Sequence, residues 1–234
     1  MKKEPFYAPE ILNDQHHLDE KDSKHATKVM RLKKGDELNI TDGVGGWYRA
    51  KIATPDSKKC AFEVIEKKQI PKNEFEIHVL ISPLKKTARF EWLIEKATEL
   101  GVDKITPVLT KRTVKQNIRR DRMERIAASA MKQSMSAWLP IINEPVELGD
   151  LLEKELEGSN KLIGNYNPNN DDIQNCIEKN KDTVLLIGPE GGFTESEIEM
   201  TNEIGFRSVN LSDKKLRSET AALYGLTLIN SCFS

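Results

Sequence analysis

Hydrophobic positions follow two different patterns along the chain. In residues 1 to about 70, apolar and polar positions alternate over 37–41 and 47–52, with a glycine-rich turn at 42–46 between them. With 61–65 as a further strand, these segments predict a small barrel or sandwich, and a short helix is expected around 23–31. The polar, proline-containing stretch 67–73 predicts a linker. We therefore expect a first domain at 1–70 and a second at 71–234.

In the second domain, apolar runs alternate with segments of helical periodicity. Expected strands are 76–81, 105–109, 162–164, 183–187 and 205–211, and 164–172 is expected to be a loop. Apolar residues at helical spacing predict helices over 88–100, with Gly101 as its stop, and over 119–137. This alternation is typical of an α/β domain with a mainly parallel sheet.

The segment 183–193 contains the clearest sign of a binding site. Residues 184–187 are all apolar, which predicts a strand buried on both faces. The strand runs into a loop at 188–192 that contains three glycines, and Thr194 and Glu197 have the spacing of a capping box at the start of a helix. A strand, a glycine loop and a capped helix predict a small-ligand site at the carboxyl end of a sheet strand.

The composition of this loop restricts its ligand. Neither the P-loop pattern nor the dinucleotide-binding glycine pattern is present, and Glu190 would repel a pyrophosphate. A nicotinamide oxidoreductase is therefore disfavoured. Backbone donors, backbone acceptors and one acid suit a ligand with a cationic centre. For this loop alone, a tight turn without a ligand is an equal alternative. Near the C-terminus, a helix opening at Ser218 contains Ala221, Ala222 and Gly225, which allow close packing.

Four blocks of sequence, in order along nearly the whole chain, resemble the ribosomal RNA small subunit methyltransferase E family. They are 25–31 with 35–36 and 42–43, then 90–102, 186–193 and 216–223. The resemblance implies an enzyme that methylates N3 of a uridine in 16S rRNA, with S-adenosylmethionine as cofactor and S-adenosylhomocysteine as product. It also implies a SPOUT-type parallel sheet with a C-terminal deep trefoil knot, preceded by a PUA-like β-barrel that binds RNA, and a homodimer acting on the small ribosomal subunit.

The resemblance also assigns site residues. Those expected to bind the cofactor lie in or beside three loops of the second domain: Ile163, Gly164, Ile187, Gly188, Glu190, Gly191, Gly192, Leu211, Leu216, Arg217 and Thr220. Those expected to contact RNA are His25, Arg31 and Gln133, which lie at or beside family positions, together with Arg112 and Arg119, which belong to a cluster of basic residues.

Arg217 and Glu190 are the candidate catalytic residues. The methyl donor is activated by its own sulfonium, so no metal is expected, but uracil N3 must lose a weakly acidic proton. Arg217 could stabilise the resulting anion, although a phosphate clamp or a salt bridge with Glu219 is an equal alternative from sequence. Glu190 could orient the cofactor, accept a proton or stiffen the loop. Because N3 lies on the pairing edge, the target base is expected to be unpaired or flipped out.

Several positions depart from the family pattern. The usual Glu-Gln-x-Gly-Arg segment reads Lys132-Gln133-Ser134-Met135-Ser136, and Trp138 stands where a basic residue is common. The resemblance does not say what these four changes, at Lys132, Met135, Ser136 and Trp138, do to RNA docking or to the dimer contact.

Charge and composition restrict the possible binding partners and the cellular location of the protein. The net charge is −1, but basic residues cluster at 24–34, 85–89 and 111–125. Any one cluster is more typical of solvated surface, whereas three clusters flanking one ligand loop make a surface that contacts phosphates more attractive. No apolar run is long enough to cross a membrane, the start lacks the apolar core of a signal peptide, and three scattered cysteines indicate a reducing compartment. A cytoplasmic protein is expected. A SPOUT ribose 2′-O-methyltransferase acting on tRNA or rRNA, and a non-catalytic RNA-binding module, remain as alternatives.

Overall fold

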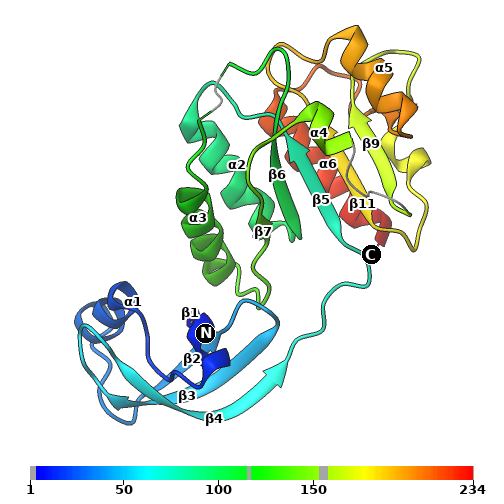
Figure 1. Cartoon of the computed structure of the whole chain (residues 1–234). Helices are drawn as coiled ribbons and strands as arrows, with labels where there is room; N and C mark the ends of the chain where they lie inside the picture. Colours follow the sequence, from blue (N-terminus) through cyan, green and yellow to red (C-terminus); the bar gives the residue numbers. More distant parts are fainter. Residues whose placement is uncertain (1–3, 115–116, 153–157, 234) are drawn as a thin grey trace. The chain divides into compact units, whose positions relative to one another are not determined.

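The computed structural model describes residues 4–114, 117–152 and 158–233 (Figure 1). The chain divides into two compact units. The first comprises residues 1–72 and 128–139, and the second comprises 73–127 and 140–234. Helix α3 (Arg120–Gln133) contributes its first half to the second unit and its second half to the first.

The first unit contains a four-stranded sheet in the order β1-β2-β3-β4. Strand β1 (Phe6–Tyr7) pairs in parallel with β2 (Glu37–Thr41), whereas β3 (Gly46–Thr54) and β4 (Ala61–Gln69) are antiparallel to their neighbours. The 3₁₀-helix η1 (Pro9–Asn13), helix α1 (Glu20–Lys24) and the π-helical turn η2 (His25–Val29) complete it. Its core includes the apolar residues Phe6, Leu18, Ala26, Leu38, Ile40, Ile52 and Phe62.

The turn between β2 and β3 is held together by Asp42. One carboxylate oxygen of Asp42 accepts the amides of Val44 (2.9 Å) and Gly46 (2.8 Å), and the other accepts the Tyr48 hydroxyl (2.9 Å). Gly45 has a φ of +95°, which favours glycine, and a Cβ there would lie 2.5 Å from the Trp138 ring. The predicted glycine turn therefore also receives the side chain of Trp138.

Two of the departures from the family pattern have structural partners within the first unit. Lys132 Nζ lies 2.9 Å from both carboxylate oxygens of Asp22, a residue only 4% exposed. The Trp138 indole donates a hydrogen bond to the carbonyl of Ile70 (3.2 Å). Removing Lys132 would leave a buried carboxylate without its cation, so this residue supports the packing of residues 128–139 on the rest of the unit.

The second unit contains a sheet in the order β10-β12-β9-β11-β5-β6-β7, with β8 pairing to β6, and its pairings are all parallel. This confirms the predicted α/β domain with a parallel sheet. The strands are β5 (Ile77–Ile81), β6 (Lys104–Leu109), β7 (Ile141–Ile142), β8 (Val146–Glu147), β9 (Asn160–Gly164), β10 (Asp171–Asp172), β11 (Thr183–Ile187) and β12 (Arg207–Asn210).

Helices cover both faces of this sheet (Figure 1). On one face, α6 (Ser218–Phe233) packs against β11, β5 and α2 (Thr87–Glu99), and a Cβ at Gly225 would lie 2.6 Å from the Leu185 side chain. On the other face, apolar residues of α4 (Leu148–Leu152) and α5 (Glu195–Glu203) pack with Leu186. The 3₁₀-helix η3 (Ile173–Cys176) also contacts α6. Because β11 is covered on both sides, all five of its residues are buried.

Some predicted bounds are wrong. Strand β4 continues to Gln69, so the first three residues of the predicted linker are strand. The helix predicted over 119–137 ends at Gln133, and Met135 adopts a left-handed φ of 56°. In the predicted loop 164–172, residues 171–172 form strand β10, which pairs with β12.

His78 in β5 makes the stability of the fold depend on pH. Burial, with a smaller contribution from Lys104, lowers the pKa of His78 to about 4, and its Nε2 lies 2.7 Å from the Thr106 hydroxyl. In the unfolded chain a histidine has a pKa of about 6.5. The contribution of neutral His78 to the free energy of unfolding is therefore fully present above pH 6.5. It is lost as the pH falls from 6.5 towards 4, because the unfolded chain takes up the proton first.

We expect this loss to reach about 2 kcal/mol at pH 5 relative to pH 7.5. The measurement is urea unfolding of the wild type and of His78→Gln at both pH values. The variant should lack this part of the pH dependence, even if it is less stable overall. Equal pH dependence in the two proteins would contradict the assignment.

Candidate functional site

A cavity of about 530 Å³ opens at the carboxyl ends of β9, β11 and β12. Because these neighbouring strands are parallel, the loops that follow them meet at one edge of the sheet. The loop at 164–166, the glycine loop at 188–192 and the segment 211–218 form its walls. A cavity therefore lies at the strand ends where the strand pattern predicts a small-ligand site.

The glycine loop has a conformation that only small residues allow. A Cβ at Gly188 would lie 2.8 Å from the Phe193 ring, closer than side chains approach one another. Gly192 has a φ of +69°, and its amide closes a turn on the carbonyl of Pro189 (2.9 Å). The backbone of this loop therefore faces the cavity without side chains at these two positions.

Two other loops of the second unit hold the glycine loop. The Arg112 guanidinium donates hydrogen bonds to the carbonyls of Gly191 (2.8 Å) and Phe193 (3.1 Å). The backbone amide of Lys85 donates to Glu190 Oε1 (3.0 Å). One carboxylate oxygen of Glu190 thus ties its loop to the β5–α2 loop, which is the stiffening role considered above, while the residue also lines the cavity.

Helix α5 begins directly after the glycine loop with the predicted capping box. The Thr194 hydroxyl accepts the amide of Glu197, and the Glu197 carboxylate accepts the amide of Thr194 (2.8 Å). The same carboxylate accepts the amide of Lys111 (2.8 Å). Burial raises the pKa of Glu197, but the amides of Thr194 and Lys111 outweigh it, so that pKa lies below its ordinary value. A charged Glu197 therefore fixes the start of α5 to the β6–α3 loop.

The opposite wall is built from β9 and the segment before α6. A Cβ at Gly164 would lie 2.7 Å from the Ile187 side chain and 3.2 Å from that of Leu211, so glycine keeps this corner open. Tyr166 is 53% exposed, and its hydroxyl lies 3.4 Å from the carbonyl of Asp213. An aromatic ring and apolar side chains on this wall can pack against a planar ligand.

Arg217 lines the cavity one residue before α6. Its side chain is exposed, and within the described parts of the chain its guanidinium has no hydrogen bond or ion pair. The salt bridge with Glu219 considered from sequence is not formed. Glu219 instead pairs with Arg89 at the start of α2 (Nε–Oε1 3.6 Å). The other oxygen of Glu219 is buried and lacks a hydrogen-bond partner among the described residues.

The predicted cofactor residues are largely brought together. All of them line the cavity except Ile163, which is buried within β9, and Thr220, which is exposed on α6. Sequence reasoning missed several residues that line it: Asn165, Tyr166, Pro189, Phe193, Val209, Ser212, Lys214, Lys215, Ser218 and Ala221. Most of these directly adjoin predicted ones. For those that follow β9, β11 and β12, the position at a strand end was the signal that could have found them.

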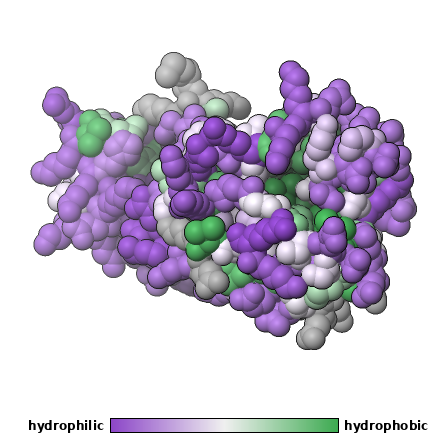
Figure 2. All heavy atoms as spheres, turned by 90° about the horizontal axis from the view of Figure 1, so that it is seen from above, coloured by the Kyte–Doolittle hydropathy of each residue, from purple (hydrophilic) through white to green (hydrophobic). Residues whose placement is uncertain are grey.

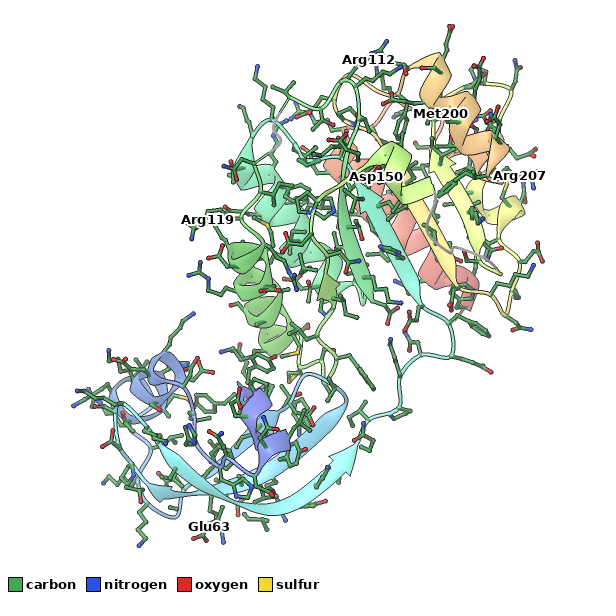
Figure 3. The ribbon with its side chains drawn as sticks, in the orientation of Figure 1. Glu63, Arg112, Arg119, Asp150, Met200 and Arg207 are labelled. Atoms are coloured by element: carbon green, nitrogen blue, oxygen red, sulfur yellow. The ribbon has the colours of Figure 1, made fainter. Side chains whose placement is uncertain are left out.

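The predicted RNA-contacting residues lie in both units. His25 is exposed in η2, and its ring makes an edge-to-face contact with that of Phe6, with 5.9 Å between the ring centroids. Arg31, just after η2, has a left-handed backbone conformation (φ 56°). Gln133 is exposed at the end of α3. In the second unit, Arg112 clamps the glycine loop, and Arg119 projects from the start of α3 (Figure 3).

The basic stretch 111–125 is partly neutralised by acids. Arg119 and Arg125 both bond Asp121, and Arg122 makes a bidentate pair with Glu91. Figure 2 shows a face on which hydrophilic side chains predominate and hydrophobic ones form small separate groups. Within the described ranges, no group of three His, Cys, Asp or Glu side chains could hold a metal ion. No helix in those ranges combines the length and apolar character of a membrane span.

Comparison with known proteins relates the chain to RNA methyltransferases. A family model described as an RNA methyltransferase domain matches residues 71–230, and a model described as an RNA methyltransferase PUA domain matches 18–65. The ribosomal RNA small subunit methyltransferase E of Mesomycoplasma hyopneumoniae is 35% identical over 206 residues, which cover 86% of this chain and 87% of that protein. The protein of the same name from Synechocystis is 32% identical over 212 residues, covering 87% of this chain and 69% of that protein.

Solved structures agree with the sequence relatives. A probable rRNA-methyltransferase from Porphyromonas gingivalis superimposes with a TM-score of 0.92 at 33% identity, over 97% of both chains. A ribosomal RNA small subunit methyltransferase E from Neisseria gonorrhoeae, bound to S-adenosylmethionine, has a TM-score of 0.88 at 26% identity, over 98% of this chain and 97% of that chain.

Proposed function

Because this chain belongs to the ribosomal RNA small subunit methyltransferase E family, we propose that it transfers a methyl group from S-adenosylmethionine to N3 of a uridine in 16S rRNA. The observation that carries the proposal is that the glycine loop 188–192 and the segment containing Arg217 line one cavity. These two segments were the strongest motif blocks of the sequence, and they lie in different parts of the chain.

The residues of the cavity fit the cofactor. A volume of about 530 Å³ lies within the range of about 300–1,000 Å³ typical of small-molecule sites. At Gly164 and Gly188 a Cβ would collide with neighbouring side chains of the cavity wall, so glycine is needed at both positions. The cavity offers backbone groups, an aromatic ring at Tyr166 and a carboxylate at Glu190. When bound, S-adenosylmethionine supplies a methyl group activated by a positively charged sulfur. We assign its binding to the cavity-lining residues of the three loops.

The chain's own residues then have separate tasks. Glu190 holds the glycine loop against the amide of Lys85, and Arg112 holds it from the other side, so the loop is positioned before the ligand binds. The unpaired guanidinium of Arg217 stabilises the negative charge that develops on the uracil as N3 loses its proton. The target base reaches the cavity in an unpaired or flipped state, because N3 lies on the pairing edge.

The finer features of the assembly are also part of the proposal. We assign a PUA-like β-barrel to residues 1–70, with His25 and Arg31 on its RNA-contacting surface, and a SPOUT domain with a C-terminal trefoil knot to 71–234. Gln133, in the segment 128–139 that groups with the first compact unit, is assigned to the same RNA-contacting surface. Matches of family models to 18–65 and 71–230 support this division. The protein would act in the cytoplasm on the small ribosomal subunit.

We further propose a homodimer formed through α2 and α6. These helices pack together, and each exposes a large side chain: Trp92 is 46% exposed and Tyr224 is 45% exposed. Sedimentation of the wild type and of Trp92→Glu tests this, with a dimer expected for the first and a monomer for the second.

The reaction is tested by mass spectrometry of 16S rRNA from a strain that lacks the gene. One 3-methyluridine should be lost and should return when the gene is restored. Loss of a ribose 2′-O-methyl group instead would identify the alternative enzyme class. Calorimetry with S-adenosylmethionine separates both enzymes from a non-catalytic RNA-binding module, which would bind none.

A further inference from the structure

A second cavity, of about 280 Å³, lies in the second unit between the β5–α2 loop, α2 and the segment that leads into α3. Its floor is apolar, because Leu84, Phe90 and Met123 line it and are each no more than 3% exposed. None of its lining residues lines the cofactor cavity, so it is a separate site: Pro83, Leu84, Thr87, Phe90, Asn117, Ile118, Arg119, Arg122 and Met123.

The β5–α2 loop connects the two cavities. Pro83 and Leu84 line the second cavity, and the next residue, Lys85, donates its amide to Glu190 of the glycine loop (3.0 Å). Glu190 in turn lines the cofactor cavity. The segments that line the two cavities are therefore in direct contact, so a chain of nucleotides whose target base enters the cofactor cavity can extend towards the second cavity.

The rim of the second cavity is polar and cationic. Asn117 offers an amide, and the side chain of Arg119, 68% exposed, projects from the start of α3 (Figure 3). Arg122 is held in place by a bidentate pair with Glu91 (2.5 and 2.7 Å). The described residues of the segments that form this rim and their neighbours, 83–92, 110–114 and 117–125, contain nine lysines and arginines but only three acids, in a chain whose net charge is −1.

We propose, resting on the function proposed above, that this cavity binds an unpaired nucleobase of the substrate RNA that neighbours the methylated uridine. The apolar floor suits the flat face of a base, the Asn117 amide suits its hydrogen-bonding edge, and Arg119 suits the adjoining phosphate. A free anion would not be stabilised by the apolar floor, and a hydrocarbon would not interact favourably with the arginines of the rim. The exposed pair of Arg119 with Asp121 is weak, so Arg119 can turn to a phosphate at little cost.

The test measures the affinity of the full-length protein for 16S rRNA fragments that contain the target uridine, each with one abasic nucleotide. Fluorescence anisotropy is measured with S-adenosylhomocysteine present. For the wild type, removal of one base beside the target should weaken binding about tenfold, as expected for loss of a single stacked base. For the double variant Asn117→Ala/Arg119→Ala, the intact RNA should bind more weakly, and the abasic penalty should be smaller than in the wild type, because the variant removes the contacts to the base edge and the phosphate but keeps the apolar floor.

Arg125→Ala is the matched control. Arg125 lies on the same helix, bonds the same Asp121 and is 69% exposed, but it does not line the cavity. This variant should keep the full penalty for the abasic nucleotide. The proposal is overturned if no abasic position beside the target matters, or if the penalty is equal in the wild type and the double variant. Either result would exclude this cavity as the binding site of a neighbouring base. Failure of the proposed function itself appears separately, as unchanged 16S rRNA in the strain that lacks the gene.

Discussion

Replacement of Arg217 by glutamine is expected to lower kcat for uridine methylation by about 10²–10³-fold, the usual cost of losing one group that stabilises a developing anion. The physical reason is that Arg217 lines the cavity with no hydrogen bond or ion pair to the described residues, so its charge is available to a ligand. Single-turnover methylation of rRNA measures the effect. Calorimetry should show that the affinity for S-adenosylmethionine changes only a few-fold.

Lys215→Gln is the control for this prediction. Lys215 lines the same cavity two residues earlier and is also exposed, so the variant removes a similar charge from the same segment. Its kcat should stay near that of the wild type. A comparable loss in both variants would mean that general positive charge matters rather than the guanidinium at position 217. An unchanged kcat in Arg217→Gln would remove this residue from the catalytic machinery.

The second large effect is expected from Gly188→Ala, which should weaken binding of S-adenosylmethionine by at least about tenfold. The new Cβ would lie 2.8 Å from the Phe193 ring, which is 9% exposed and packed in the core below α5. The ring or the loop must move, and both line the cavity. Calorimetry measures the affinity, and the melting temperature should also fall.

Gly191→Ala provides the comparison within the same loop. A Cβ at this position would lie 3.4 Å from the Arg112 side chain, which is ordinary contact with a flexible neighbour. We expect its affinity for the cofactor to stay within about threefold of the wild type, because surface substitutions without a clash usually change free energies by less than about 0.5 kcal/mol. If Gly188→Ala bound as well as Gly191→Ala, the close packing of Gly188 would not be what shapes the site.

Local patterns in the sequence predicted the parts of the site whose structure depends on residues adjacent in the chain. The unbroken apolar run 184–187 indicated a strand covered on both faces, and β11 is buried throughout. Thr194 and Glu197 indicated a capping box, which is formed. The glycine loop could be predicted without knowledge of its tertiary contacts, because three glycines in five residues already indicate an unusual backbone conformation. These features depend on a few consecutive residues, so one sequence suffices to read them.

Tertiary structure alone decided which distant side chains support the site. Arg112 clamps a loop 79 residues away, Lys85 meets Glu190 across 105 residues, and Glu219 pairs with Arg89 rather than Arg217. Lys132, a departure from the family pattern, pairs with Asp22 across 110 residues. No periodicity records such contacts, because they arise only when parallel strands bring the loops at their carboxyl ends to one edge, or when the end of one helix packs beside another helix that is distant in sequence. The sequence by itself therefore determined the longer strands, the glycine turn and the family, whereas the folded chain determined the two-residue strands, which charges meet, which stay buried, and which are available to a ligand.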